Sequence, residues 1–317
     1  MNNYSEINKL KNVKSVCIIG HLDPDSDALS SMVVFKHFLQ NHLNVRNVDL
    51  FADTNRISED CQSILNGEII NPPLNNYNVA IALDSTTLER LGKYQETFLN
   101  AQKRFVIDHH KTNTNYGDIN IIENSSSTCE IIYSILKAYK YKLTNRDREL
   151  IYSGIITDTN NFTTPSLTER TFSTVSEIIE HIDHVSIYEN FFAKFSIKNM
   201  KLFAKSIENV ISLENEKILI TYLTKEDLIK ENADHNDLVG IVNRIATISG
   251  NLLTCFIHPK ENNMYVSLRA KKGYDVAQIA KKFNGGGHTG ASGFITKLNI
   301  EETINIIKQE FIAEIKK

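Results

Sequence analysis

The sequence predicts an α/β protein whose N-terminal part is built on a parallel β-sheet. Short apolar runs alternate with helical patterns in the first half of the chain. These runs show no polar–apolar alternation, which is typical of strands that are buried on both faces. Helices that connect such strands cover the two faces of a parallel sheet. The four runs are residues 15–20, 47–52, 78–84 and 104–108.

Helical periodicity appears in the order that this fold requires. Thr144 and Asp147 form a capping pair at the start of one helix, and residues 168–181 suit a further one. The stretch 187–205 is charged and amphipathic and has neither Gly nor Pro, so we expect a helical connector there. The three helical patterns of the first half lie at residues 28–41, 128–138 and 145–157.

A second, smaller α/β domain is expected after the connector, because strand-like runs and helical patterns alternate again. The strand-like runs are residues 217–223, 252–258, 264–270 and 291–296. Helices are expected at about 234–248, at 276–283 and at the C-terminal end. The chain is therefore expected to divide into a first domain at 1–186, the connector at 187–210 and a second domain at 211–317.

Composition limits the partners that the protein can have. The 317 residues carry a formal net charge of −3, which excludes the broad cationic surface that binds long nucleic acids. No stretch approaches the roughly 18 apolar residues of a membrane span, and the first residues are polar, unlike a signal peptide. We therefore expect a cytoplasmic protein with no membrane partner. Four widely spaced cysteines are expected to be buried, reduced thiols: Cys17, Cys61, Cys129 and Cys255.

Acidic and imidazole side chains follow three of the predicted strands. The carboxyl ends of parallel strands lie at one edge of a sheet, where binding sites form, so we expect these side chains to converge. Asp158 lies at the end of a predicted helix, where the helix dipole disfavours a negative charge. The strand-end residues are His21, Asp25 and Asp27 after the first run, Asp84 after the third, and Asp108, His109 and His110 after the fourth.

Bound cations are the simplest compensation for the repulsion among so many carboxylates. Each of these groups of strand-end residues, taken alone, is explained by a solvated loop or a turn. Their joint occurrence at ordered strand ends predicts a metal centre with two divalent ions. Imidazoles among the carboxylates favour a transition metal such as manganese, iron or cobalt over calcium, and we expect Mn²⁺.

Five motifs resemble, in order, those of DHH phosphoesterases with a C-terminal DHHA1 domain. The combination is similar to bacterial bifunctional oligoribonuclease and pAp phosphatase proteins of the nanoRNase type, pAp being 3′-phosphoadenosine 5′-phosphate. The resemblance covers the chain from about residue 14 to residue 300. The motifs are GHLDPDSDALSS at 20–31, ALDS at 82–85, VIDHH at 106–110, GIITDTNNF at 154–162 and NGGGHTGASG at 284–293.

The resemblance implies a role for each of these residues. His110 would face the scissile phosphate, as a phosphate contact or as the group that helps to protonate the leaving oxygen. Asp108 would orient an imidazole. Asn160 stands where the family often has Gly, so the loop beside Asp158 is expected to change. The serine-rich segment 125–128 is expected to cap a helix. His21, Asp25 and Asp158 would hold one ion, Asp27 and His109 the second, and Asp84 would bridge them.

The second domain is expected to select the substrate. Arg269 can bind a phosphate through two parallel hydrogen bonds, and His288 can donate from its loop. Arg90 is a further candidate contact. Three successive glycines allow backbone N–H groups to approach an anion closely: Gly285, Gly286 and Gly287.

The resemblance implies hydrolysis of RNA fragments of two to five nucleotides to mononucleotides, and conversion of pAp to AMP. Linear dinucleotides such as pApA or pGpG would fit as well. The basic patch around the glycine motif is small and suits short oligonucleotides and no long nucleic acid. It consists of Arg269, Lys271, Lys272, Lys281 and Lys282. The oligomeric state stays open, with a homodimer as one option.

Three other functions are weighed against this interpretation. A manganese-dependent family II inorganic pyrophosphatase shares the N-terminal motifs, but its second domain carries an Arg/Lys-rich motif where this chain has GGGH. A non-catalytic nucleotide sensor would be expected to lose metal ligands, and all six are present. A processive single-strand exonuclease of the RecJ kind needs further nucleic-acid-binding domains.

Overall fold

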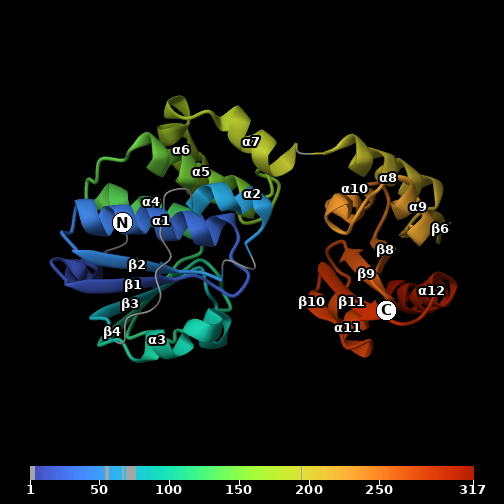
Figure 1. The fold of residues 1–317 in the computed structure, drawn as a ribbon, viewed down its shortest axis with the longest axis horizontal. Helices are drawn as coiled ribbons and strands as arrows, with labels where there is room; N and C mark the ends of the chain where they lie inside the picture. The colour runs from blue at the N-terminus through green and yellow to red at the C-terminus, as the bar shows by residue number, and fades with distance from the viewer. Residues whose placement is uncertain (1–3, 54–56, 66–67, 69–75, 194) are drawn as a thin grey trace. The chain divides into compact units, whose positions relative to one another are not determined.

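The computed structural model describes residues 4–53, 57–65, 68, 76–193 and 195–317. Two compact units divide the chain, and the second begins at Phe195 (Figure 1). No helix within the described part of the chain combines the length and the apolar character that a membrane span requires. The four cysteines are buried and reduced, as expected.

The first unit contains a five-stranded parallel sheet in the order β2-β1-β3-β4-β5, which confirms the predicted fold class. The four predicted runs form β1 to β4, and their interior residues are almost fully buried. The edge strand β5 was not predicted, because it is short and only partly buried. The strands are β1 Ser15–Ile19, β2 Asn47–Phe51, β3 Val79–Leu83, β4 Lys103–Asp108 and β5 Ile119–Ile122.

Helices cover both faces of this sheet (Figure 1). Helices α1, α4 and α5 pack on one face through the larger apolar core, and α3 with the 3₁₀ helix η4 packs on the other. The α-helices are α1 Ser26–Asn41, α2 Glu59–Gln62, α3 Gln95–Leu99, α4 Thr128–Ala138, α5 Asn145–Asp158, α6 Glu169–Ile178 and α7 His184–Phe192. The 3₁₀ helices are η1 Ser5–Leu10, η3 Ser63–Leu65, η4 Leu88–Tyr94 and η5 Ile179–His181.

An ion-pair cluster joins helix α1 to the start of α5. Thr144 and Asp147 form the predicted capping box, and the buried Asp147 carboxylate also contacts Nδ1 of His37 at 2.6 Å. Nε2 of His37 lies 3.4 Å from Glu68. The hydrogen bond with Asp147, followed by that with Glu68, raises the pKa of His37 to about 9.

Replacing His37 by Ala is expected to lower the free energy of unfolding by about 2–3 kcal/mol at neutral pH, because Asp147 loses its buried cationic partner. Since the folded-state pKa of His37 is raised, this stabilisation is complete below pH 6.5 and is lost as the pH rises through about 9. Denaturant unfolding across this pH range measures the effect. The exposed His181 provides the control H181A, and a His37 effect that stays constant with pH contradicts the prediction.

The second unit is a six-stranded mixed sheet in the order β10-β11-β9-β8-β7-β6. Helices α11 and α12 pack on one face, while α8, α9 and α10 surround a smaller apolar cluster with β7 and β8. The strands are β6 Ile211–Leu213, β7 Ile218–Tyr222, β8 Leu253–Lys260, β9 Asn263–Ala270, β10 Gly286–His288 and β11 Ala291–Thr296. The helices are α8 Ile197–Glu208, α9 Lys225–Lys230, η6 Asn236–Leu238, α10 Ile241–Ile245, α11 Val276–Lys282 and α12 Ile300–Ile315.

Two helical predictions were too continuous. The single helix expected at 234–248 is divided into η6 and α10, because Gly240 between them adopts a φ of +82° that a helix cannot contain. The stretch expected to be one helical connector contributes to two helices. Helix α7 belongs to the first unit and α8 to the second.

Candidate metal centre

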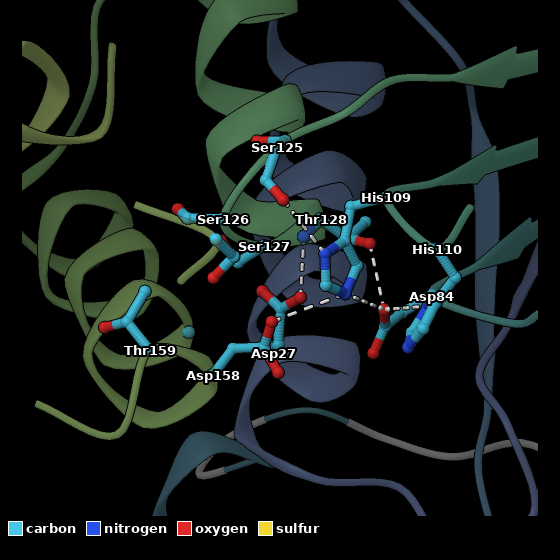
Figure 2. A network of polar contacts seen from close by, with 12 residues as sticks. Asp27, Asp84, His109, His110, Ser125, Ser126, Ser127, Thr128, Asp158 and Thr159 are labelled. Carbon is cyan, nitrogen blue, oxygen red and sulfur yellow. Dashed lines mark hydrogen bonds and ion pairs between the residues drawn. The ribbon is translucent and has the colours of Figure 1, made fainter. Parts of the chain in front are cut away.

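The carboxyl ends of β1, β3 and β4 bring the predicted acids and imidazoles together at one edge of the sheet, with the last residue of α5 beside them (Figure 2). Each of three groups has ligand-type atoms that lie within 4.8 Å of one another. The groups are His21, Asp25 and Asp84; Asp27, His109 and Asp158; and Asp84, Asp108, His109 and His110.

The first group forms between strand β1, the start of α1 and the end of β3. Nε2 of His21 lies 3.8 Å from Asp25 and 3.7 Å from Asp84. Asp25 is the N-cap of α1, and its carboxylate accepts a hydrogen bond from the N–H of Ala28. Asp84 adopts a φ of +56°, a left-handed conformation that Asp tolerates better than most residues. The backbone therefore turns sharply where the strand ends, and this turn directs the carboxylate into the cluster.

The second group shows where Asp158 lies. Nε2 of His109 is 3.4 Å from Asp158 and 3.5 Å from Asp84 (Figure 2). The resemblance implied that Asp158 would share an ion with His21 and Asp25, whereas the structure places it beside Asp27 and His109. The reason is that α5 packs against α1, so that its last residue meets Asp27 in the first turn of α1. Asp84 has contacts to both groups.

The tautomer of His109 suits a metal ligand. Its Nδ1 faces the carbonyl oxygen of Ser125 at 3.3 Å and is therefore the protonated nitrogen, which leaves a lone pair on Nε2. This Nε2 is buried and has no hydrogen-bond partner among the described residues, although two carboxylates lie around it. A divalent cation satisfies both the lone pair and the carboxylates, so the residues present fit such an ion.

Burial and mutual repulsion make this cluster costly without a cation. Burial, followed by repulsion from neighbouring carboxylates, raises the pKa of Asp84 to about 7. The pKa of Asp27 is raised to about 6 by its burial and by Asp158. Burial is also the main reason that the pKa of Asp158 is raised to about 6. Three neighbouring acids that resist ionisation are typical of a site built around positive charge.

His110 occupies a different position from its neighbour. Its Nδ1 lies 2.7 Å from the buried carboxylate of Asp108, which also accepts from the side-chain amide of Asn113 at 2.7 Å. Burial lowers the pKa of His110, but the hydrogen bond to Asp108 and nearby carboxylates outweigh it and raise the pKa to about 9. Asp108 thus fixes the orientation of the His110 ring and leaves Nε2 facing away from it.

The sequence did not reveal how Asp27 is oriented. The backbone N–H groups of Thr128 and Cys129, at the start of α4, donate to its two carboxylate oxygens at 2.6 and 2.9 Å. The hydroxyl of Thr128 donates to Asp84 at 3.0 Å (Figure 2). Ser127 caps α4, as expected for this segment. The N-terminus of α4 therefore positions two acids of the cluster, Asp27 through backbone donors that have no side-chain signature and Asp84 through the Thr128 hydroxyl.

A buried ion pair holds the start of α4 in place. Glu130 is fully buried, and its carboxylate accepts from Ser126, from Thr171 at 2.8 Å and from Arg170 at 2.5 Å. Arg170 also donates to Glu123 at 2.8 Å. These bonds connect α4 to α6 directly behind the residues that orient Asp27.

Arg170→Met is expected to lower the free energy of unfolding by about 3 kcal/mol, because it leaves the Glu130 charge buried without a cation. It is also expected to weaken Mn²⁺ binding, since the amides that orient Asp27 lose their support. Denaturant unfolding and metal titration measure the two effects. R46M, at an exposed arginine outside both helices, is the control. Adding Glu130→Gln to Arg170→Met should restore part of the stability. No change in either measurement contradicts the assignment.

Other predicted residues lie at the margin of the cluster. Arg90 is exposed, and a guanidinium nitrogen lies 3.0 Å from Nδ1 of His21. Asn160 adopts a φ of +45°, so it takes the left-handed conformation that glycine would provide, and Asn is well suited to it. Asp23 is exposed and belongs to none of the three groups.

The residues predicted to bind substrate in the second unit lie on β9 and β10, the two strands that pair with β11. Arg269 is on β9, where Nε donates to Asn243 at 2.8 Å. His288 is exposed at the end of β10, directly opposite Ala291 of β11. Of the glycine run, Gly286 and Gly287 lie in β10 and Gly285 immediately precedes it.

Comparison with known proteins agrees with the motifs. The model of the DHH family N-terminal domain matches residues 15–155, and the DHHA1 domain model matches residues 215–317. The chain is 26% identical to a probable bifunctional oligoribonuclease and PAP phosphatase NrnA of Streptococcus mutans, with 90% of each chain covered. It is 28% identical to the bifunctional oligoribonuclease and PAP phosphatase NrnA of Bacillus subtilis, with 86% of each covered.

A solved structure shares the fold. The exopolyphosphatase-related protein from Bacteroides fragilis superposes with a TM-score of 0.83 at 23% identity, over 96% of this chain and 93% of that protein. The fold, the clustered acids and imidazoles and the two domain matches agree with one another. The protein is a hydrolase of the DHH family, a DHH phosphoesterase with a C-terminal DHHA1 domain.

Proposed function

We propose that this phosphoesterase hydrolyses RNA fragments of two to five nucleotides to mononucleotides and removes the 3′-phosphate of pAp to give AMP. The observation that carries the proposal is that two groups of ligand-type atoms lie on either side of Asp84. The chain is also similar, along most of its length, to proteins named for these two activities. The net charge of −3 favours short substrates over long nucleic acids.

In this proposal two divalent ions, Mn²⁺ by preference, are held by His21, Asp25 and Asp84 and by Asp27, Asp84, His109 and Asp158. In such sites the ions lower the pKa of an attacking water and neutralise charge on the phosphate. Three residues act around them: Thr128 fixes Asp84, Cys129 and Thr128 fix Asp27, and Ser125 holds His109 in its ligating tautomer.

His110 is proposed to be the catalytic residue that protonates the leaving oxygen. Its Nδ1 is held by Asp108, so Nε2 is the nitrogen available to a substrate. The hydrogen bond between Nδ1 and the Asp108 carboxylate favours the protonated ring, which is the form that a general acid requires. The second unit is proposed to bind the rest of the substrate through Arg269, His288 and the glycine run, with Arg90 as a further phosphate contact.

Turnover by the Mn²⁺-loaded protein tests the proposal. We expect release of AMP from pAp and of mononucleotides from a 5′-phosphorylated RNA dinucleotide, with little activity on long RNA or DNA. Phosphate release from pyrophosphate alone would identify a pyrophosphatase instead. Binding of pAp without turnover would identify a sensor, and a strong preference for long DNA would indicate an exonuclease. Each of these three outcomes contradicts the proposal.

A further inference from the structure

One face of the β9–β11–β10 part of the second unit's sheet is a candidate for ligand binding. Helices α11 and α12 cover the opposite face, where Val266, Leu268 and Phe294 are buried (Figure 1). The residues of the first face all keep some exposure. Cross-strand pairing places these residues on it: Arg269 opposite Ala291, Ser267 opposite Gly293, Tyr265 opposite Ile295, and Gly286 on the other side of Gly293.

The fold explains two of the three successive glycines and leaves the third unexplained. A Cβ on Gly285 would lie 2.3 Å from the carbonyl oxygen of Gly293, and one on Gly287 would lie 2.5 Å from that of Ala291. A Cβ on Gly286 would have no atom within 4 Å, and the φ of this residue is not positive. Folding does not require glycine at position 286. The absence of a side chain there leaves room for a ligand on the exposed face.

A cavity of about 110 Å³ with polar and apolar lining residues lies at the Arg269 end of this face. Arg269, Lys271, Asn251 and Thr254 are among its lining residues. Asn251 is 3% exposed, and its amide nitrogen donates to Thr254 at 2.5 Å, whereas its amide oxygen is buried without a partner in the described part of the chain. Two cations and an unused acceptor suit a phosphate with an adjoining hydroxyl group.

An aromatic group lies at the other end of the same face. The Tyr265 ring lies across Gly293, with its Cζ 3.8 Å from the position that a Gly293 Cβ would occupy. The His258 and His235 rings lie 5.3 and 5.5 Å from the Tyr265 ring, centroid to centroid. Nζ of Lys260 is 5.6 Å from the Tyr265 centroid, so a charged side chain reaches the ring from solvent.

We propose that Tyr265 is a stacking platform for a nucleobase of a short RNA whose neighbouring phosphate is bound by Arg269. Tyr265 and Arg269 are four residues apart on one face of β9, a span of about 13 Å. A cationic phosphate site followed by an accessible aromatic ring is the usual composition of a single-strand binding surface. This inference rests on the proposed function and adds to it a base contact that reads no particular sequence.

Steady-state kinetics test the platform with two substrates, pApA and an analogue that has the same phosphates but lacks the second base. Tyr265→Leu is expected to raise KM for pApA about tenfold or more and to leave KM for the analogue and kcat for both unchanged. Tyr265→Phe, which keeps the ring, is expected to stay within about twofold of wild type. An equal loss with both substrates, or no loss with either, overturns the proposal.

Gly286→Val supplies a second variant at a position that has room for a side chain. It is expected to melt like the wild-type protein and to raise KM for pApA by about tenfold, with Gly286→Ala between the two. A Gly286→Val protein that is folded and binds pApA normally shows that the face is not used, and it overturns the proposal.

A binding measurement separates this inference from the proposed activity. The chain has no Trp, so Y265W provides a single reporter that a stacked base should quench. Titration in EDTA prevents turnover: pApA is expected to quench, while the analogue and inorganic phosphate are not. Y188W, at a half-exposed tyrosine of α7, is the control. If the wild type hydrolyses neither substrate, the proposed function fails and this titration still decides the stacking. Absence of quenching in a folded Y265W protein overturns the platform.

Discussion

Replacing Asp84 by Asn is expected to reduce kcat on pAp and on RNA dinucleotides by on the order of 10³-fold or more. Asp84 has contacts to both groups of ligand-type residues, so its charge serves two proposed ions at once. Asn has the same shape and can still accept the hydrogen bond from Thr128. The loss therefore reports the missing charge and not a cavity. Stopped assays at saturating Mn²⁺ measure kcat, and a metal titration measures the parallel loss of affinity.

The same variant is expected to make the metal-free protein more stable, by about 1–3 kcal/mol at pH 8. The pKa of Asp84 is raised to about 7 by burial and by neighbouring carboxylates, so its ionised form destabilises the fold. The destabilisation by Asp84 is absent below about pH 4 and complete above about pH 7, so the wild-type protein loses stability relative to Asp84→Asn as the pH rises. Denaturant unfolding with and without Mn²⁺ tests it. Asp23→Asn, in the same acidic segment as Asp25 and Asp27, is the control. An Asp84→Asn enzyme that keeps its activity would contradict the proposed bridging role of Asp84.

Two features explain why so much of the cluster could be predicted from the sequence. Acids and imidazoles stand at the ends of β1, β3 and β4, and parallel strands end at a common edge, so their convergence follows from topology. The apolar runs were also unambiguous, because strands buried on both faces are apolar at nearly every position. Local pattern and tertiary arrangement agree in this part of the chain.

The position of Asp158 within the cluster could not be predicted from strand topology. It lies at the end of a helix, and the group that it joins depends on how α5 packs against α1, which no local pattern encodes. The amides of Thr128 and Cys129 were missed for a related reason, since a backbone donor is the same in every residue type. Strand β5 has only four residues, all partly buried, and β10 is the apolar-poor sequence Gly-Gly-His, so neither gives the long apolar run on which strand prediction depends. A glycine at position 240 is compatible with a break in the helix, but the helical periodicity on both sides of it favoured one continuous helix.

Replacing His110 by Gln is expected to lower kcat on pApA by about 10²–10⁴-fold, the usual contribution of a general acid. The structure gives this residue its orientation, because Asp108 accepts from Nδ1 at 2.7 Å and is itself held by Asn113. Gln retains a donor of similar length but cannot transfer a proton. KM is expected to change little, since proton transfer to the leaving oxygen occurs only in the transition state.

The leaving group distinguishes proton donation from a simple phosphate contact. A ribose alkoxide needs protonation as it departs, whereas p-nitrophenolate is stable without it. His110→Gln is therefore expected to lose about 10²-fold or more on pApA but less than about tenfold on a p-nitrophenyl phosphodiester. Asp108→Asn should show the same selectivity in weaker form, because it disturbs the orientation of the ring without removing it. Equal losses on both substrates would mean that His110 stabilises phosphate charge. The proton would then come from solvent, and the buried Asp108 would serve to orient the partly exposed His110 as a cation that faces the phosphate.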